Sequence, residues 1–152
     1  MSARKLQKPA AFELQTPEFE IWLGRMNEEV ASLIELVPGL DGSPASLDRL
    51  ESWLLSRYAS ISDARPDSEA VTIGRAARYV GEVFRKHTGS KWAIEDRDPK
   101  YMFRGLPVLV GGTLPTPDCP RSMVTASLDR RTGHYLSSIL NNVLRSPKDG
   151  DH

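Results

Sequence analysis

The chain has 152 residues, of which 39% are hydrophobic and 26% are charged, and its 20 basic and 20 acidic residues cancel to a formal net charge of zero. That length suits one domain with its own core, and the balanced charge excludes a global field that would attract nucleic acid or an anionic membrane. The single cysteine, Cys119, excludes an intrachain disulfide and a cysteine-based zinc cluster.

No targeting or membrane-spanning segment is visible in the sequence. The basic N-terminus is not followed by the apolar core of a secretory signal, and no apolar run reaches the ~18 residues that a membrane span needs. We therefore expect a cytoplasmic protein with a single domain over residues 1–152. Residues 1–16 lack periodicity and are expected to form a loose arm, and residues 146–152 a frayed polar tail.

Two amphipathic helices are predicted in the first half of the chain. Apolar residues over 19–37 recur with helical spacing, and Thr16 and Pro17 supply an N-cap and a first helical residue. This helix is expected to end near Pro38. A second helix is expected to begin at Ser43 and to bury the stripe Leu47, Leu50, Leu54 and Tyr58.

Residues 67–89 form the clearest predicted helix, around which we expect the other elements to pack. Apolar and small side chains cover more than half of its circumference, so several neighbours must contact it. Asp67 is placed as its N-cap and Gly89 as its C-terminal glycine. A stripe of small residues predicts the close approach of another backbone: Ala70, Gly74, Ala77 and Gly81. The opposite strip, with Tyr79 beside it, is expected to face water: Arg75, Arg78, Glu82, Arg85 and Lys86.

After Gly89 the hydrophobic period changes from 3.6 to 2, which is typical of strands. We expect extended chain over 91–96, 101–104 and 107–110, in an antiparallel sheet of two or three strands. Residues 121–129 fit a helix or a strand, with the helix favoured, and a last helix covers 136–144. The prediction is an α+β fold, a helix-rich single domain with a central buried helix and a small antiparallel sheet.

The residues capable of chemistry are few and scattered. His87, His134 and His152 have no second histidine or cysteine at helical spacing, so no metal site is predicted, and no cofactor or catalytic residue is assigned. Cys119 precedes Pro120 at a possible helix start, where a thiol can become nucleophilic. An ordinary packed residue is the favoured interpretation of this cysteine.

Glu82 and the acids near residue 96 are the more informative carboxylates. Glu82 has cationic neighbours at helical spacing and the phenol of Tyr79 beside it, which suits a solvated ion-pair network or recognition of a partner's arginine. Glu95, Asp96 and Asp98 lie at a predicted strand end and turn, where oxygen ligands could hold magnesium or calcium. Their spacing does not match an EF-hand loop, and turn formation is the favoured interpretation.

A short pattern on the central helix and just after it resembles a known type of domain. Small uncharacterised bacterial domains have a Y-x-G-E helix followed by a G-x-W hairpin, and one additional residue separates Gly89 from the tryptophan in this chain. Because some of these domains occur beside bacterial toxins, the resemblance implies an immunity-type or other binding role and supplies no catalytic residues. It covers about residues 47–140, and the matching positions are Tyr79, Gly81, Glu82 and Trp92.

Two functions of different classes follow as expectations. The leading one is a non-enzymatic protein-binding module, an immunity protein that neutralises a toxin by occluding its active site. The alternative is a small enzyme or ligand-binding regulator that uses Glu82 and Tyr79 in a cleft. A third possibility is a subunit that dimerises through the helix over 17–37, and the oligomeric state is left open. The residues assigned to partner binding are Arg78, Tyr79, Glu82, Glu95, Asp96 and Asp98.

Overall fold

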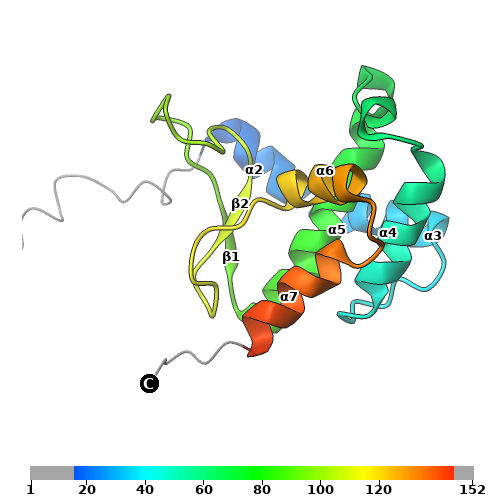
Figure 1. The fold of residues 1–152 in the computed structure, drawn as a ribbon. Coiled ribbons are helices and arrows are strands. Elements are labelled where there is room, and N and C mark those ends of the chain that lie inside the picture. The colour runs from blue at the N-terminus through cyan, green and yellow to red at the C-terminus, as the bar shows by residue number, and fades with distance from the viewer. Residues whose placement is uncertain (1–15, 146–152) are drawn as a thin grey trace, which may run out of the picture.

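The computed structural model describes residues 16–145, in which helices surround one long helix and a two-stranded antiparallel sheet lies at one side (Figure 1). The predicted helix-rich α+β fold is confirmed. The arm expected over residues 1–16, apart from Thr16, and the tail expected over 146–152 lie outside the described residues. In chain order the elements are α2 (Pro17–Gly24), α3 (Met26–Leu36), α4 (Ser46–Arg57), the 3₁₀ turns η2 (Ile61–Ala64) and η3 (Asp67–Glu69), α5 (Ala70–Thr88), β1 (Lys91–Ala93), β2 (Val108–Val110), α6 (Pro120–Arg130) and α7 (Tyr135–Arg145).

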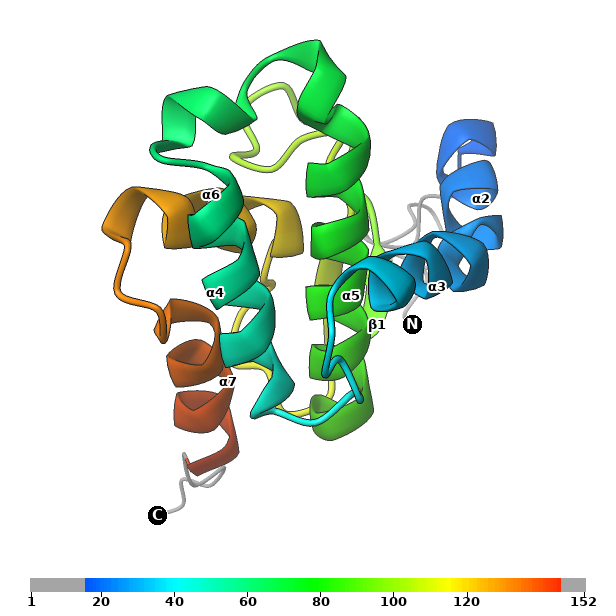
Figure 2. The same ribbon diagram turned by 90° about the vertical axis from the view of Figure 1, so that its right-hand side faces the viewer.

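Helix α5 is the centre of the fold, as predicted. It contacts α3, α6 and α7 (Figures 1 and 2), and most of its apolar residues beyond the first turn, among them Val80 and Phe84, are buried. Gly89 ends the helix with a left-handed φ of 75°. The N-terminus differs from the prediction, because Asp67 begins the 3₁₀ turn η3 and no side chain caps either η3 or α5.

The small-residue stripe of α5 is buried at Ala77 and Gly81 but not along its whole length. Ala70 is exposed, and a Cβ added at Gly74 would meet nothing within 4 Å. A Cβ added at Gly81 would overlap the ring of Trp92. The expected close backbone along the whole stripe is therefore wrong, because the neighbour at Gly81 is the Trp92 side chain of β1 and Gly74 has open space beside it.

The helix predicted over 17–37 is divided in two by a bend at Arg25. Thr16 caps the first part as predicted, because its hydroxyl accepts the Phe19 N–H at 3.1 Å, and the second part ends at Val37. Arg25 has φ −94° and ψ 5°, outside the helical region, and it follows Gly24, a residue of low helix propensity. Figure 2 shows α2 inclined to α3 as a result.

The remaining helices follow the predicted stripes closely. The start expected at Ser43 is shifted to Ser46, since residues 43–45 form a turn in which the Ser43 hydroxyl accepts the Ser46 N–H at 3.2 Å. Residues 121–129, which fitted a helix or a strand, are helical in α6, with Pro120 in its first turn. Helix α7 matches the last predicted helix.

The sheet contains two strands among residues 16–145, with Trp92 of β1 opposite Leu109 of β2. The extended chain predicted over 101–104 is wrong. These residues form turns, in which the Arg104 N–H bonds the Tyr101 carbonyl at 3.1 Å. Gly105 has a φ of 77°, which removes it from any strand.

One continuous hydrophobic cluster joins α4, α5, α6 and α7. Leu50, Val80, Leu128 and Leu136 are among its members, and each is fully enclosed. The stripes read from the sequence therefore face one another in this core. None of the helices formed by the described residues combines the length and apolar content that crossing a membrane would require.

Candidate functional site

Three of the four residues that carry the resemblance meet in one internal contact. The missing side chain at Gly81 makes room for the indole of Trp92, and the Glu82 carboxylate accepts the Trp92 Nε1–H at 2.7 Å. Arg85 also donates to Glu82, at 3.0 and 3.2 Å to the two carboxylate oxygens. Glu82 is therefore engaged in tying β1 to α5, together with Gly81 and Trp92.

Tyr79, the fourth residue of the pattern, is buried with 2% of its surface exposed. Its hydroxyl lies 2.7 Å from the Ser46 hydroxyl and accepts the Gly42 N–H at 2.9 Å. The expectation that Tyr79 lies on a strip facing water is wrong. The aromatic body follows the apolar arc of α5, and the hydroxyl bonds the first residue of α4 and the turn before it.

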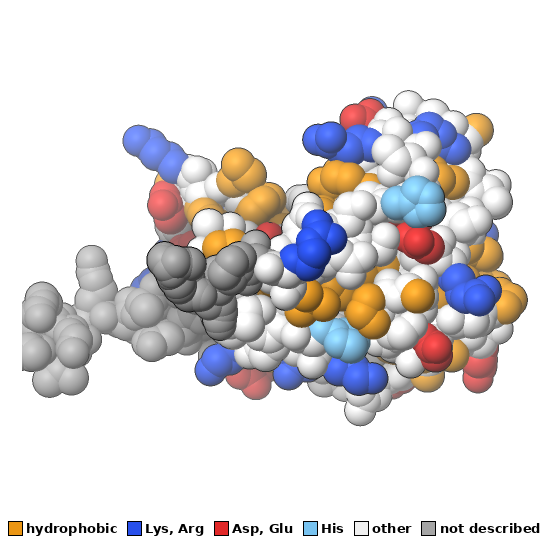
Figure 3. Space-filling view, turned by 60° about the horizontal axis from the view of Figure 1, so that its bottom comes forward, with side chains coloured by type: hydrophobic (Ala, Val, Ile, Leu, Met, Phe, Trp, Pro, Cys, Tyr) orange, Lys and Arg blue, Asp and Glu red, His pale blue; other side chains and the backbone are white. Residues whose placement is uncertain are grey.

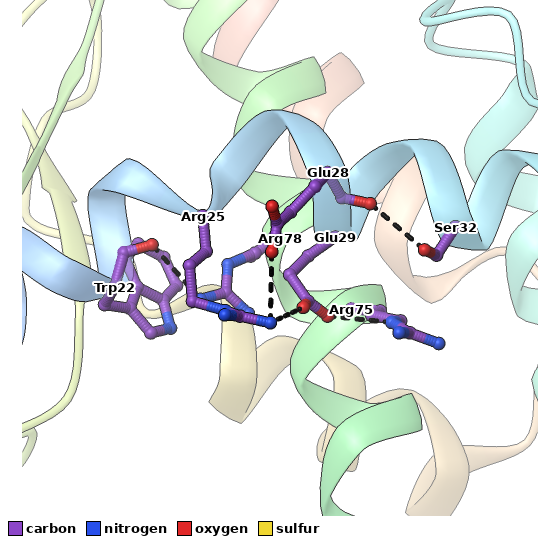
Figure 4. Close-up of polar contacts among 7 residues, drawn as sticks. All are labelled: Trp22, Arg25, Glu28, Glu29, Ser32, Arg75 and Arg78. Atoms are coloured by element: carbon purple, nitrogen blue, oxygen red, sulfur yellow. Dashed lines mark hydrogen bonds and ion pairs between the residues drawn. The ribbon is translucent and has the colours of Figure 1, made fainter.

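Arg78 also lies inside the protein, under the bend between α2 and α3 (Figure 4). Its Nη2 donates to the Trp22 carbonyl at 3.1 Å, and its guanidinium carbon lies 4.5 Å from the centroid of the Trp22 ring. Burial lowers the pKa of this guanidinium. The assignment of Arg78 to an exposed binding strip is corrected, because α2 folds over it.

The polar cluster beside Arg78 holds the bend in place. Glu29 accepts hydrogen bonds from Arg75 and Arg25, each at 2.8 Å (Figure 4). These hydrogen bonds lower the pKa of the Glu29 carboxyl. Glu28 and Glu29 form ion pairs with Arg25, and Glu29 also pairs with Arg75, so this cluster connects α3 with α5.

The acids predicted after β1 do not form one acidic surface with Glu82. Glu95 is 3% exposed, and one carboxylate oxygen accepts the N–H groups of Arg97 and Asp98. Burial alone would raise the pKa of Glu95, but these hydrogen bonds, together with the charge and the side-chain hydrogen bond of Arg97, outweigh burial and lower it. Asp96 and Asp98 are exposed in the β1–β2 connection, where Asp98 accepts the N–H of residue 100 at 2.9 Å. Glu95 therefore shapes the turn and is not a surface residue.

Tyr79 and Glu82 do line a common hollow of about 380 Å³ between α3 and α5, as the enzyme alternative requires. Both polar groups, however, are already hydrogen-bonded within the protein. A general acid or base needs a proton-transfer group directed at the substrate. The arrangement presents apolar side chains such as Val30 and Ile34 to the hollow, with the polar groups directed to partners in the chain.

A larger hollow, of about 490 Å³, lies between the β1–β2 connection, α6 and α7. We call it the α6–α7 groove. Met102 at its edge is 80% exposed. The lining residues are Met102, Phe103, Pro117, Asp118, Cys119, Ser122, Met123, Ala126, Tyr135 and Ile139. Sequence reasoning missed this groove because it placed Met102 and Phe103 in a strand, and the only available signal was an apolar pair beside turn residues.

Asp118 is the unusual member of the groove. Its backbone is held by hydrogen bonds of 2.8 and 3.0 Å to Leu109, while its half-buried carboxylate has no hydrogen-bond or ion-pair partner in the part of the chain that is described. Burial raises the pKa of this carboxyl. A carboxylate with a perturbed pKa in a hollow is a candidate functional group.

Asp118→Asn is expected to stabilise the isolated protein at neutral pH by roughly 0.5 to 1 kcal/mol, because a half-buried charge without a partner is removed. The raised pKa means that protonation favours the folded state. The gain should therefore be smaller at about pH 4 than at neutral pH, because the raised pKa lets the folded wild type take up the proton as the pH is lowered. Urea unfolding at both pH values measures the effect. The exposed Asp96→Asn in the β1–β2 connection, outside any helix, is the matched control, and an equal gain there would contradict the prediction.

The histidines and the cysteine have ordinary surroundings. The Nε2 of His87 lies 3.2 Å from the Gly42 carbonyl, and the Nδ1 of His134 lies 3.2 Å from an Asp48 carboxylate oxygen. Cys119 is buried beneath the β1–β2 connection. Within residues 16–145, no group of three or more histidine, cysteine, aspartate or glutamate residues is placed to hold a metal ion.

No protein-family model, curated protein or solved structure matches this chain. The resemblance to Y-x-G-E domains therefore stays a prediction. The structure adds a physical reason for the pattern itself, since Gly81, Glu82 and Trp92 need one another to pack β1 on α5. The α6–α7 groove is then the best candidate for a functional site, because its Asp118 carboxylate has no partner among the described residues.

Proposed function

We propose that this protein is a non-enzymatic protein-binding module of the cytoplasm whose partner-binding surface is the α6–α7 groove. The observation that carries the proposal is the exposed apolar edge of this groove, in which Met102 is 80% exposed next to the partly buried Phe103. Exposed apolar surface around a hollow is typical of interaction sites, and methionine adapts its shape to a partner.

A bacterial toxin is the proposed partner, with the module covering the toxin's active site as an immunity protein does. The support for this part is the resemblance of the Y-x-G-E pattern. Asp96 and Asp98, which were assigned to partner binding, remain exposed in the same connection as Met102. On the face in Figure 3, acidic and basic side chains are interspersed among apolar ones. Such a surface binds through shape and local pairs rather than through one broad field.

Met102→Asp is expected to weaken partner binding by at least about tenfold, because it places a charge in the apolar edge of the interface. The partner is first captured from the native host on the immobilised full chain and identified by mass spectrometry. It is then purified, and the dissociation constants of wild type and variant are measured by calorimetry. For a toxin, co-expression of the wild type should restore growth and co-expression of Met102→Asp should not.

Val71→Asp is the matched control, since Val71 is 58% exposed but lies at the start of α5 and not in the α6–α7 groove. Its binding is expected to stay within about twofold of the wild type. A purified partner whose affinity is unchanged by Met102→Asp, or is reduced equally by Val71→Asp, would contradict the assignment of the surface.

A further inference from the structure

Asp118 stands apart from the other carboxylates of the described chain. Every other carboxylate that is not fully exposed has a hydrogen bond or an ion pair. These are Glu29 with Arg25 and Arg75, Asp48 with Ser137, Glu51 with two N–H groups of α7, Glu69 with Tyr58 and Arg57, Glu82 with Trp92 and Arg85, and Glu95 with two N–H groups of its turn. The half-buried Asp118 has no such partner within residues 16–145. A carboxylate left in this state costs stability.

The local structure does not account for this cost. Asp118 precedes α6, but the N-cap residue is Cys119 and no side chain accepts an N–H of the first turn. The pairing of the Asp118 backbone with Leu109 would be the same for any residue that has an N–H group. The backbone of Asp118 is therefore fixed by its pairing with Leu109, while its carboxylate makes no hydrogen bond or ion pair with the described residues.

The surroundings of Asp118 combine one charge with an apolar wall. Among the described residues that line the α6–α7 groove, Asp118 is the only charged one, and Phe103, Met123 and Ile139 supply apolar surface. A long basic side chain has the complementary form, with an apolar stem and a cationic head. A volume of about 490 Å³ also leaves room for residues that flank such a side chain.

We infer that the α6–α7 groove receives a lysine or arginine side chain of the partner protein, with its cationic head at the Asp118 carboxylate and its stem along Phe103, Met123 and Ile139. The inference rests on the proposed function, because it names the chemistry of the segment that enters the same groove. The incoming head supplies charge-assisted hydrogen bonds to a carboxylate that receives none from the described residues of the free protein. The apolar wall excludes water from that pair, which strengthens it.

The test uses three capped peptides and the ¹⁵N-labelled full chain. The peptides are Gly-Leu-Lys-Leu-Gly, the same sequence with uncharged norleucine in place of lysine, and the same sequence with glutamate. Amide shifts during titration report both the site and the affinity. We expect the lysine peptide to shift signals of Met102, Phe103 and Ser122 and to bind about fivefold more tightly than the norleucine peptide. Asp118→Asn should remove this preference.

The outcomes separate the inference from the proposed function. Equal affinities of the lysine and norleucine peptides for the wild type, a lysine preference that survives Asp118→Asn, or no shift with any peptide would overturn the inference. The proposed function is judged by another result, namely the effect of Met102→Asp on the affinity of the purified partner. Because Asp118→Asn is expected to stabilise the fold, a lost preference would not reflect unfolding, and the amide spectrum of the free variant verifies this.

Discussion

Replacement of Gly81 by alanine is expected to lower the free energy of unfolding by about 2 to 3 kcal/mol, although alanine favours a helix by about 1 kcal/mol over glycine. The new methyl group would overlap the ring of Trp92, so the indole would have to move. Its Nε1–H would then lose the Glu82 carboxylate at 2.7 Å. The edge contact with Trp22, 4.8 Å between ring centroids, would be lost as well. Urea unfolding at neutral pH measures the change.

Gly74→Ala provides the matched control on the same helix. A Cβ at Gly74 would meet nothing within 4 Å. Stability is then changed only by the greater preference of alanine for the helical backbone, and the variant should be more stable by roughly 0.5 to 1 kcal/mol. The same glycine-to-alanine change is thus expected to destabilise the protein at position 81 and to stabilise it at position 74. Stabilisation by both would show that Trp92 does not pack against Gly81 in solution.

Glu51→Ala is expected to destabilise the protein by about 3 kcal/mol. Glu51 is fully buried on α4, and its carboxylate oxygens accept the N–H groups of Tyr135 at 3.1 Å and Leu136 at 2.9 Å. These are N–H groups at the start of α7, which have no partner within their own helix. Alanine would leave both of them unpaired in the interior. Thermal and urea unfolding of the variant measure the loss.

Two control variants test whether the loss of stability comes from the hydrogen bonds that the Glu51 carboxylate accepts. Glu51→Gln retains one acceptor oxygen and should lose roughly half as much stability as Glu51→Ala. Glu35→Ala removes an exposed carboxylate of α3 and should change stability by less than about 0.5 kcal/mol. If Glu51→Ala were as mild as Glu35→Ala, the carboxylate would not be holding α7.

The Glu51 contact also bears on the proposed binding surface. Tyr135 and Ile139, which line the α6–α7 groove, belong to the helix that Glu51 holds. A carboxylate of α4 thus positions one wall of the groove from behind. Glu51 therefore belongs to the supporting structure of the groove, although it does not line it.

Local patterns accounted for most of the secondary structure. The stripes that became α4, α5 and α7, the cap at Thr16 and the glycine that ends α5 all depend on residues within a few positions of one another. The errors arose where a local pattern was compatible with two conformations. The 17–37 stripe continues across the bend at Arg25, and residues 101–104 alternate without a strand to pair with.

The candidate site was less accessible from the sequence. Arg78, Tyr79 and Glu95 were assigned to a surface because they are polar, but α2, the chain before α4 and a turn of the β1–β2 connection cover them. Polarity indicates that a side chain needs partners and does not say whether water or protein supplies them. The assignment of Asp96 and Asp98 to partner binding stays a prediction.

Residue spacing alone was sufficient to predict a central helix enclosed by others and a small antiparallel sheet, because periodicity records which side of each element must leave water. Only the folded chain determined that Gly81 and Glu82 are committed to Trp92 and that the Asp118 carboxylate, beside Met102 and Phe103, has no partner among residues 16–145. The groove combines residues from 102 to 139, and their distances depend on how α6 and α7 pack on α5. No local pattern contains that information, since it arises from contacts between segments that are distant in the chain.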